Sequence, residues 1–358
     1  MSILKAPLKV GIIGYGKVGK IRYGCVQRCP DLQLLGICDN DSKVLHNCGI
    51  KYYSDYKQLL DKKPDIVFVC TYNCYIPEIS IEAISRGVHV FSEKPPGCTL
   101  DDVRSIQQAV LKNPAVKVKF GFNHRYHKGV IEAKSLVDSG RLGKIMWMRG
   151  VYGKAGGHDY DKSWRNNKKL SGGGILIDQG IHMLDLFRYF TGEFDEVKSF
   201  VANSYWKVEV EDNVFALLRN SKTVQTAMIH SSATQWRHKF LLEIYMEKGY
   251  LEIDGILSST QTYGRETLKI ARCIFDEDRY PLSNPQEYKT YYENDNSWLE
   301  EINEFVDCIV SNKPVTNGGI DDAVKTMELV QRIYVDDAGN SNLDSNPLLG
   351  AAFARRIS

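Results

Sequence analysis

The 358-residue sequence lacks several features that mark other classes of protein. No apolar run approaches the roughly 20 residues that a membrane-spanning helix needs, and the short apolar run near the start does not have the pattern of a signal peptide. Lys and Arg number 46 against 44 Asp and Glu, so no strong field of one sign favours a nucleic acid or an anionic membrane. We therefore expect a cytoplasmic protein that binds a small molecule, with neither nucleic acid nor membrane as a partner.

Metal-binding signatures are also missing. Nine cysteines are present, but no two of them form a CxxC pair, which excludes the spacing of a zinc ribbon. No HExxH sequence occurs either. We expect reduced thiols, most of them buried in apolar strands, and no bound metal.

The first part of the chain alternates short apolar runs with amphipathic segments up to about Asn123. Fully apolar strands separated by helices predict a parallel sheet that is covered on both faces, which is the doubly wound α/β class. We therefore predict a Rossmann domain over residues 1–123. Its predicted helices cover residues 17–28, 55–62, 76–86 and 100–112.

Residues 124–337 have a different rhythm and predict a second, α+β domain. Repeated β runs between about 196 and 275 are joined by short polar turns, which is typical of a large, mostly antiparallel sheet. Helices are expected near 127–139, 297–311 and 320–337, and the last of these could pack back on the Rossmann domain. Residues 338–358 are expected to form a tail, either a mobile end or a docking segment.

A GxGxxG pattern follows the first predicted strand and opens a helix. Its glycines are Gly14, Gly16 and Gly19. In a dinucleotide site the first allows a tight turn, the second lets the pyrophosphate approach the backbone, and the third lets the helix lie close to the strand. The helix that begins at Lys17 and Val18 then offers amide donors and its positive dipole end to the phosphates.

The next predicted strand ends in Asp39, 20 residues after Gly19. An acidic side chain at this place would accept hydrogen bonds from the adenosine ribose hydroxyls and would repel a 2′-phosphate. We therefore expect NAD as the cofactor. Lys43 keeps NADP open as the less favoured alternative.

Three consecutive glycines, Gly172 to Gly174, precede Asp178, His182 and Asp185. On a helix, spacings of four and three would place these polar side chains on one stripe, beside an apolar stripe that faces the core. The stripe alone allows a metal site, a proton-transferring site or a solvated helix face. Lys94 lies in the sequence "EKPPG". Its residue type alone allows either a catalytic role or binding of a phosphate.

Taken together, GxGxxG, "EKP" and "GGGILIDQGIHMLD" make the chain resemble the Gfo/Idh/MocA family of glucose-fructose oxidoreductases, inositol dehydrogenases and their relatives. The resemblance extends over about residues 8–335. It implies that Lys94 lies beside the nicotinamide, often after a bend through a cis peptide, with Asp178 and His182 across the substrate as the other catalytic residues. It also implies that Glu93 lies near the nicotinamide ribose.

The resemblance also assigns the walls of the site. Where the family often has TPNxxH, this chain has "TYNCYI", so Thr71 and Asn73 remain as cofactor contacts and Tyr72 alters that wall. Asn123 and Arg125 are implied to face the substrate. In the loop before the glycines, an aromatic face at Trp164 and a guanidinium at Arg165 suit a sugar ring and an anionic group. Asp178 and His182 complete the expected substrate contacts.

These residues predict an NAD(H)-dependent oxidoreductase that acts on a ring hydroxyl or ketone of a sugar, cyclitol or nucleotide sugar. Oxidising a secondary alcohol removes a hydride and a proton, and His182 with Lys94 would handle the proton. A hydride transfer of this kind needs no Lewis acid when Lys94 is present, so we expect no metal. Two alternatives stay open, an NAD-dependent glycosidase that oxidises C3 transiently and a non-catalytic NAD-binding sensor. By resemblance we expect a homodimer or homotetramer.

Overall fold

A computed structural model of the chain describes residues 6–41, 49–258, 261–277 and 279–340. Lys43 and residues 341–358 of the predicted tail lie outside the described residues. The chain divides into two compact units, and we describe each by itself. The first unit comprises Met1–His127, Lys169–Gly172 and Asp295–Lys325, and the second comprises Lys128–Lys168, Gly173–Asn294 and Thr326–Ser358.

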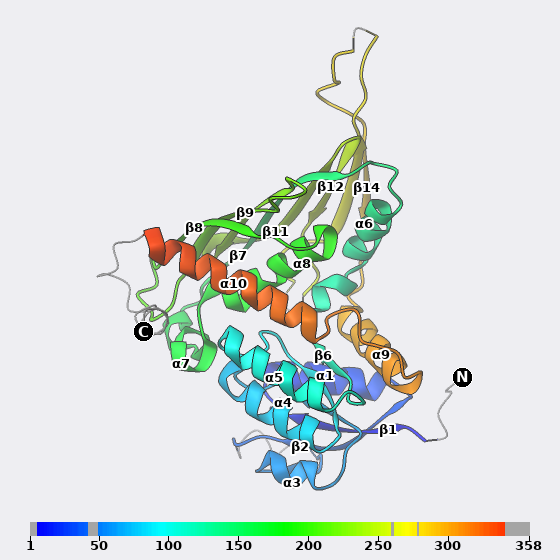
Figure 1. The fold of residues 1–358 in the computed structure, drawn as a ribbon, viewed down its shortest axis with the longest axis vertical. Coiled ribbons are helices and arrows are strands. Elements are labelled where there is room, and N and C mark those ends of the chain that lie inside the picture. Colours follow the sequence, from blue (N-terminus) through cyan, green and yellow to red (C-terminus); the bar gives the residue numbers. More distant parts are fainter. Residues whose placement is uncertain (1–5, 42–48, 259–260, 278, 341–358) are drawn as a thin grey trace. The chain divides into compact units, whose positions relative to one another are not determined.

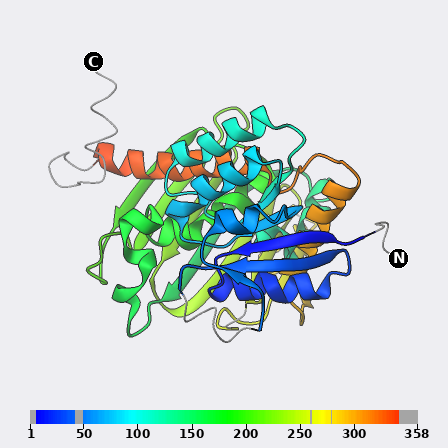
Figure 2. The ribbon, with the colours of Figure 1, turned by 90° about the horizontal axis from the view of Figure 1, so that it is seen from below.

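The first unit is built on a six-stranded parallel sheet in the order β3-β2-β1-β4-β5-β6. The strands are β1 (Leu8–Ile13), β2 (Leu32–Cys38), β3 (Tyr52–Tyr53), β4 (Ile66–Val69), β5 (His89–Ser92) and β6 (Val118–Phe120). All four residues of β4 are buried, as expected for a strand that is covered on both faces. Figure 2 shows β1, β2 and α1 (Lys17–Arg28) together in blue.

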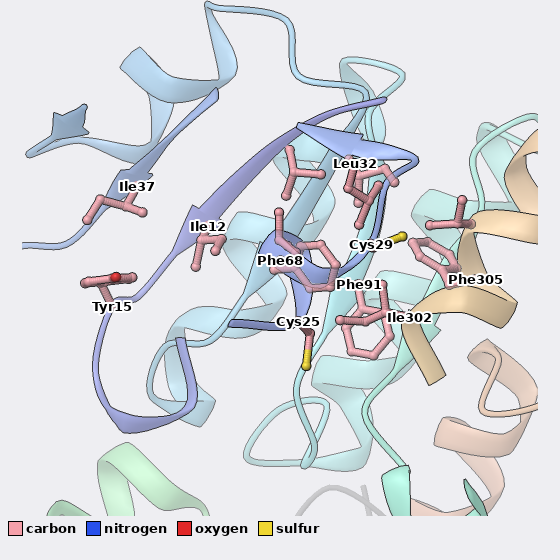
Figure 3. Packing of buried hydrophobic residues seen from close by; sticks show 14 residues of the cluster. Ile12, Tyr15, Cys25, Cys29, Leu32, Ile37, Phe68, Phe91, Ile302 and Phe305 are labelled. Atoms are coloured by element: carbon pink, nitrogen blue, oxygen red, sulfur yellow. The ribbon is translucent and has the colours of Figure 1, made fainter. Parts of the chain in front are cut away.

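Further helices of this unit are α3, α4, α5 and α9. They span Tyr56–Leu60, Ile76–Ser85, Leu100–Lys112 and Ser297–Val310. Helix α9 comes from the far end of the chain but packs into the first hydrophobic core, where the Phe305 ring lies 5.7 Å from Phe91 and Phe91 stacks on Phe68 (Figure 3). Asp295–Lys325 therefore completes the core that the first 127 residues begin.

The second unit is built on an eight-stranded sheet in the order β14-β13-β12-β11-β7-β10-β9-β8 (Figure 1). Every neighbouring pair is antiparallel except β7 and β10, which run parallel. The strands are β7 (Ile145–Ala155), β8 (Glu196–Ala202), β9 (Asn213–Arg219), β10 (Thr226–Ser232), β11 (Thr234–Met246), β12 (Gly249–Asp254), β13 (Thr267–Arg272) and β14 (Glu287–Tyr291).

Helix α8 (Ile181–Thr191) packs on one face of this sheet. A side chain at Gly150 of β7 would meet Met183 at 2.5 Å and Phe187 at 2.8 Å, so the glycine allows the helix to lie close to the strand. Helix α6 spans Lys128–Asp138, and α10 spans Ile320–Asn340. The predicted fold class, a Rossmann sheet plus a larger and mostly antiparallel sheet, is confirmed.

The structure differs from the predicted elements in several places. Strand β8 ends at Ala202, inside the region where β runs were expected, because the amides of residues 204–206 bond to the Asp212 carboxylate instead of a neighbouring strand. Strand β14 was not predicted, since all its residues are exposed and no alternation marks it. The segment Leu176–Gly180 is a π-helical turn, so Asp178 and His182 do not follow regular α-helical spacing.

Candidate active site

The GxGxxG turn has the geometry that a dinucleotide requires. Gly14 has a φ of +89°, and a Cβ there would lie 2.5 Å from the Cys70 carbonyl oxygen. A Cβ on Gly19 would lie 2.0 Å from the Gly14 oxygen, so only glycine lets α1 start this close to the turn. Gly16 has no neighbour within 4 Å of its Cβ position, which leaves room for a phosphate group above the backbone.

The polar groups around this turn suit the rest of NAD. No side chain caps α1, whose first residues Lys17 and Val18 leave their amides facing the end of the helix. Asp39 follows β2 directly and accepts a hydrogen bond from the Tyr15 amide at 2.6 Å through one oxygen and from the Asp41 amide at 3.0 Å through the other. These bonds fix the carboxylate at the carboxyl end of the strand, where a ribose binds in this fold.

The "EKP" segment follows β5 at the same edge of the sheet. The peptide bond between Lys94 and Pro95 is cis, as the family resemblance implies, and Lys94 is half-buried. Glu93 accepts a hydrogen bond from Nε of Arg22 at 2.6 Å, and Nη2 of Arg22 donates to Glu301 at 2.9 Å. The Arg22 guanidinium also stacks on the rings of Phe91 and Trp298, at 4.3 and 4.5 Å from their centroids.

The buried side chains of Arg22 and Glu301 hold Glu93 in place. The Arg22 side chain is fully buried, and burial raises the pKa of Glu301 to about 7, although the charges of Arg22 and Lys119 oppose the shift. Gly121 leaves the space that Glu93 and Arg22 occupy, since a Cβ there would lie 2.8 Å from a Glu93 oxygen. Glu93 is therefore oriented by Arg22 of α1, which Glu301 of α9 holds from its other side.

The segment after β4 lies at the same edge. Thr71 donates from its hydroxyl to the Tyr72 carbonyl at 3.3 Å, and Tyr72 stacks on Tyr75 with both rings exposed. Asn73 is 5% exposed, and its amide donates to the Ser171 carbonyl at 2.8 Å. Asn73 thus fixes the residue that precedes the three glycines, a contact that the sequence did not predict.

The three glycines are required by the protein's own packing. Gly172 has a φ of +83°, and a Cβ there would lie 2.4 Å from the Cys98 oxygen. In the second unit, a Cβ on Gly174 would lie 2.0 Å from the Glu211 oxygen. The buried Glu211 carboxylate accepts the amides of Gly174 at 2.8 Å and Leu176 at 3.1 Å, and it accepts the Tyr334 hydroxyl at 2.8 Å. Glu211 therefore holds the turn that leads to Asp178.

Asp178 lies in the π-helical turn and forms ion pairs with two cations. One carboxylate oxygen lies 2.8 Å from Nζ of Lys154 on β7, and the other lies 3.0 Å from Nε of Arg165. Arg165 in turn lies over the Trp164 ring, with 4.6 Å between its guanidinium carbon and the ring centroid. Arg165 and Asp178 were predicted separately as substrate contacts, and the structure brings them together with Lys154.

His182 opens α8 and is 4% exposed. Its ring lies 6.4 Å from the ring of the buried Tyr152 on β7, and Tyr152 packs edge-on against Tyr263 at 5.4 Å. Tyr263 accepts a hydrogen bond from the Gln179 amide at 2.6 Å. Burial, together with the nearby Tyr263 and Asp178, raises the pKa of Tyr152 well above its ordinary value, so this phenol stays protonated.

Asn123 and Arg125, which were predicted to contact the substrate, form hydrogen bonds with other side chains of the first unit. Asn123 donates to the Ser297 hydroxyl at 3.2 Å, and Arg125 binds Asn317 at 3.0 Å and Asp322 at 2.9 Å. Arg125 is 3% exposed. These contacts give both residues a structural role, and substrate binding by them stays a prediction.

Several residues of this region were not predicted from sequence. Lys154 lies on β7, and Glu211 lies two residues before β9 begins at Asn213. Within the described ranges, no group of three or more His, Cys, Asp or Glu side chains could hold a metal ion. The eight cysteines described are all free thiols.

Comparison with known proteins places these features in a family. A family model described as an oxidoreductase family with an NAD-binding Rossmann fold matches residues 8–122, and one described as the GFO/IDH/MocA C-terminal domain matches residues 130–252. No helix in the described part of the chain is both long and apolar enough to cross a membrane.

Individual relatives agree with this placement. The chain is 34% identical to the D-glucoside 3-dehydrogenase of Escherichia coli over 58% of its own length and 60% of that relative. It is 27% identical to the myo-inositol 2-dehydrogenase of Thermotoga maritima, over 88% and 92% of the two chains. The solved aldose-aldose oxidoreductase of Caulobacter crescentus has a TM-score of 0.79 at 25% identity and covers 93% of this chain and 98% of its own. With its NAD-binding turn and its eight-stranded second sheet, the chain belongs to the GFO/IDH/MocA family of oxidoreductases.

Proposed function

We propose that this protein is an NAD-dependent dehydrogenase that oxidises a secondary hydroxyl on the ring of a sugar or cyclitol, with Lys94 and His182 handling the proton. One observation carries the proposal. Asp178 forms ion pairs with Lys154 and Arg165, and it lies in the turn that leads directly into the helix of His182. Fixed donors and acceptors of both signs suit a ligand that is covered with hydroxyl groups.

The relatives support the substrate class. One is named for oxidation at position 3 of a glucoside, and another for oxidation at position 2 of myo-inositol. Both names describe a secondary alcohol on a six-membered ring. We therefore propose a ring hydroxyl or ketone of this kind for the present chain, and NAD in preference to NADP because Asp39 is fixed at the end of β2.

The residues would divide the chemistry as follows. NAD, when bound, supplies the hydride acceptor at its nicotinamide ring. His182 would accept the hydroxyl proton, since an imidazole does so near neutral pH. Lys94, at the carboxyl end of β5, would stabilise the developing alkoxide or share its proton. Asp178 would hydrogen-bond a neighbouring hydroxyl while Lys154 and Arg165 hold its carboxylate in place.

A screen of glucosides, free sugars, cyclitols and nucleotide sugars with NAD and NADP tests the activity. We expect the absorbance of reduced nicotinamide to rise with NAD and at least one ring alcohol. A panel in which no compound produces NADH would contradict the dehydrogenase, and release of an aglycone without net NADH would indicate the glycosidase instead.

Substitution of the two proposed proton carriers tests the mechanism. Lys94→Met and His182→Asn are each expected to lower kcat by about 10²- to 10⁴-fold, the range that general acid–base groups contribute. His182→Asn should leave the Kd for NADH near the wild-type value. Lys112→Met, at an exposed lysine of α5, is the control and should leave kcat unchanged. Wild-type kcat in both variants would remove the proposed roles and favour a non-catalytic sensor.

We also propose a homodimer or homotetramer that forms through the open face of the second sheet. Phe215 and Leu217 are exposed at alternate positions of β9. Phe200 on β8 lies opposite Phe215 in the pairing of the two strands. All three side chains are about half exposed or more, with Phe200 at 72%. Light scattering after size exclusion measures the number of subunits. The cytoplasmic location stays a prediction from sequence.

A further inference from the structure

Four aromatic rings form a cluster in the second unit that the proposed chemistry does not use. The Tyr160 and Trp206 rings lie 4.8 Å apart, and Tyr205 lies 5.1 Å from Trp206 and 5.2 Å from Trp236. Tyr205 and Trp236 are 57% and 62% exposed, whereas rings of this size normally bury most of their surface. Exposed aromatic faces held in one place are what a flat, partly apolar ligand requires.

The rings are held by buried polar groups. The fully buried Asp212 accepts the amides of Ser204 and Tyr205, both at 2.7 Å, and that of Trp206 at 3.0 Å. Although burial alone would raise the pKa of Asp212, these bonds and one from Asn213 lower it, so the carboxylate stays ionised. The loop that carries two of the rings is therefore fixed before any ligand binds.

Trp206 is fixed at its indole as well. Its Nε1 donates to the Ala233 carbonyl at 2.9 Å, and the same carbonyl accepts the Gly156 amide at 3.0 Å. A Cβ on Gly156 would lie 2.2 Å from the Trp206 ring, so glycine is needed for this packing. Since the indole N–H is already bonded to the protein, only the π face of Trp206 is left to serve a ligand.

The cluster continues from the proposed catalytic residues. Lys154, which pairs with Asp178 at 2.8 Å, also lies over the Tyr160 ring at 5.8 Å from its centroid. Tyr160 contacts Trp206, and Trp206 lies 6.5 Å from Trp236. If one hydroxylated ring of a ligand binds at Asp178, the group attached to that ring would therefore extend toward these four aromatic rings.

We propose that Tyr160, Trp206, Tyr205 and Trp236 form a subsite for a second sugar ring, so that the substrate is a two-ring glycoside and not a free monosaccharide or cyclitol. The apolar C–H face of a pyranose would stack on the indole and phenol faces. This inference rests on the proposed dehydrogenase function and specifies its substrate class.

The test compares each disaccharide with the methyl glycoside of the same anomeric configuration, cellobiose with methyl β-D-glucoside and maltose with methyl α-D-glucoside. Wild-type enzyme should give a kcat/KM about tenfold higher for one disaccharide than for its methyl glycoside, which is the scale of one or two aromatic contacts. Trp236→Ala should remove this preference and leave kcat/KM for the methyl glycoside unchanged. Tyr288→Ala is the control, because Tyr288 on β14 is 64% exposed and lies outside the cluster.

A binding measurement separates the subsite from the catalytic proposal. Cellobiose and maltose should quench the tryptophan fluorescence of the wild type, and Trp236→Ala should weaken binding by about tenfold even if no sugar is oxidised. Equal kcat/KM values for disaccharide and methyl glycoside, or equal losses for both in Trp236→Ala, would overturn the proposal. A change in subunit number in Trp236→Ala by light scattering would also overturn it, since the rings would then serve a contact between copies.

Discussion

Two charge clusters, one in each unit, are inverse arrangements of the same kinds of group. In the first unit one cation, Arg22, holds two carboxylates, and the side chains of Arg22, Glu93 and Glu301 are 0%, 9% and 0% exposed. In the second unit one carboxylate, Asp178, holds two cations, with side-chain exposures of 18% for Asp178, 19% for Lys154 and 40% for Arg165.

The difference in exposure suggests different roles for the two clusters, one as a structural support and one as a direct contact with a substrate. Charges sealed from water cost several kcal/mol to bury, so the first cluster is stable only as a complete set and suits a support for the "EKP" segment. Charges that keep partial access to water can exchange solvent for a ligand at little cost. The second cluster therefore suits direct contact with a substrate, and three measurements can sharpen or break this contrast.

The largest effect is expected for Arg22→Met. This change leaves Glu93 and Glu301 buried without their cation, and breaking a buried pair in this way destabilises a protein by about 3–5 kcal/mol. Denaturant unfolding measures the free energy change. Arg86→Met is the matched control, because Arg86 also bridges two carboxylates, Asp61 and Glu82, but at the surface, where water screens the charges and the expected loss is much smaller. Equal losses for the two variants would show that burial does not distinguish the clusters.

A smaller effect is expected for the pH dependence of stability through Glu301. Its pKa is raised to about 7 in the folded state, so between the unfolded value near 4.5 and pH 7 the folded state binds more protons. Its contribution to stability is therefore largest below about pH 4.5 and falls as the pH rises to 7, by about 1.4 kcal/mol for each unit of pKa shift.

Unfolding of Glu301→Gln across this pH range isolates the contribution. The variant should lack the loss of stability between pH 4.5 and 7 that Glu301 causes in the wild type. Glu300→Gln, at an exposed position on the same helix, should keep the wild-type profile. Identical profiles for Glu301→Gln and the wild type would mean that Glu301 titrates normally and that the first cluster is not sealed.

The smallest effect on stability is expected for Asp178→Asn. Lys154 and Arg165 keep contact with water, so losing their partner should change the free energy of unfolding by only about 1 kcal/mol. The same variant should lose at least about a hundredfold in kcat if Asp178 contacts the substrate. A large loss of stability with unchanged kcat would reverse the roles of the two clusters.

The sequence predicted those parts of the molecule that local backbone geometry determines. Gly14 and Gly19 admit no other residue, so their spacing, together with Asp39 at the end of the next predicted strand, indicated the dinucleotide turn. The apolar runs of the first sheet predicted a parallel sheet because both of its faces are covered. The short exposed strand β14 carries no comparable pattern, and it was missed.

Contacts between distant side chains could not be predicted in the same way. Lys154 and Asp178 form an ion pair only because β7 and the π-helical turn lie together in the folded unit. No spacing in the sequence predicts this contact. The four-residue spacing of Asp178 and His182 suggested an α-helical stripe, because a π turn has no recognised signal in the residues themselves.

The Glu211 carboxylate limits the substitutions that this protein can accept. It joins three segments, the glycine turn at Gly174, its own position before β9 and Tyr334 near the end of α10. Aspartate is one methylene shorter and could not reach both the Gly174 amide and the Tyr334 hydroxyl from the same backbone. Alanine at 174 would place its Cβ 2.0 Å from the backbone carbonyl oxygen of Glu211. Laboratory evolution toward new ligands should therefore leave these three positions fixed and find its useful mutations at exposed side chains such as Tyr205 and Trp236 instead.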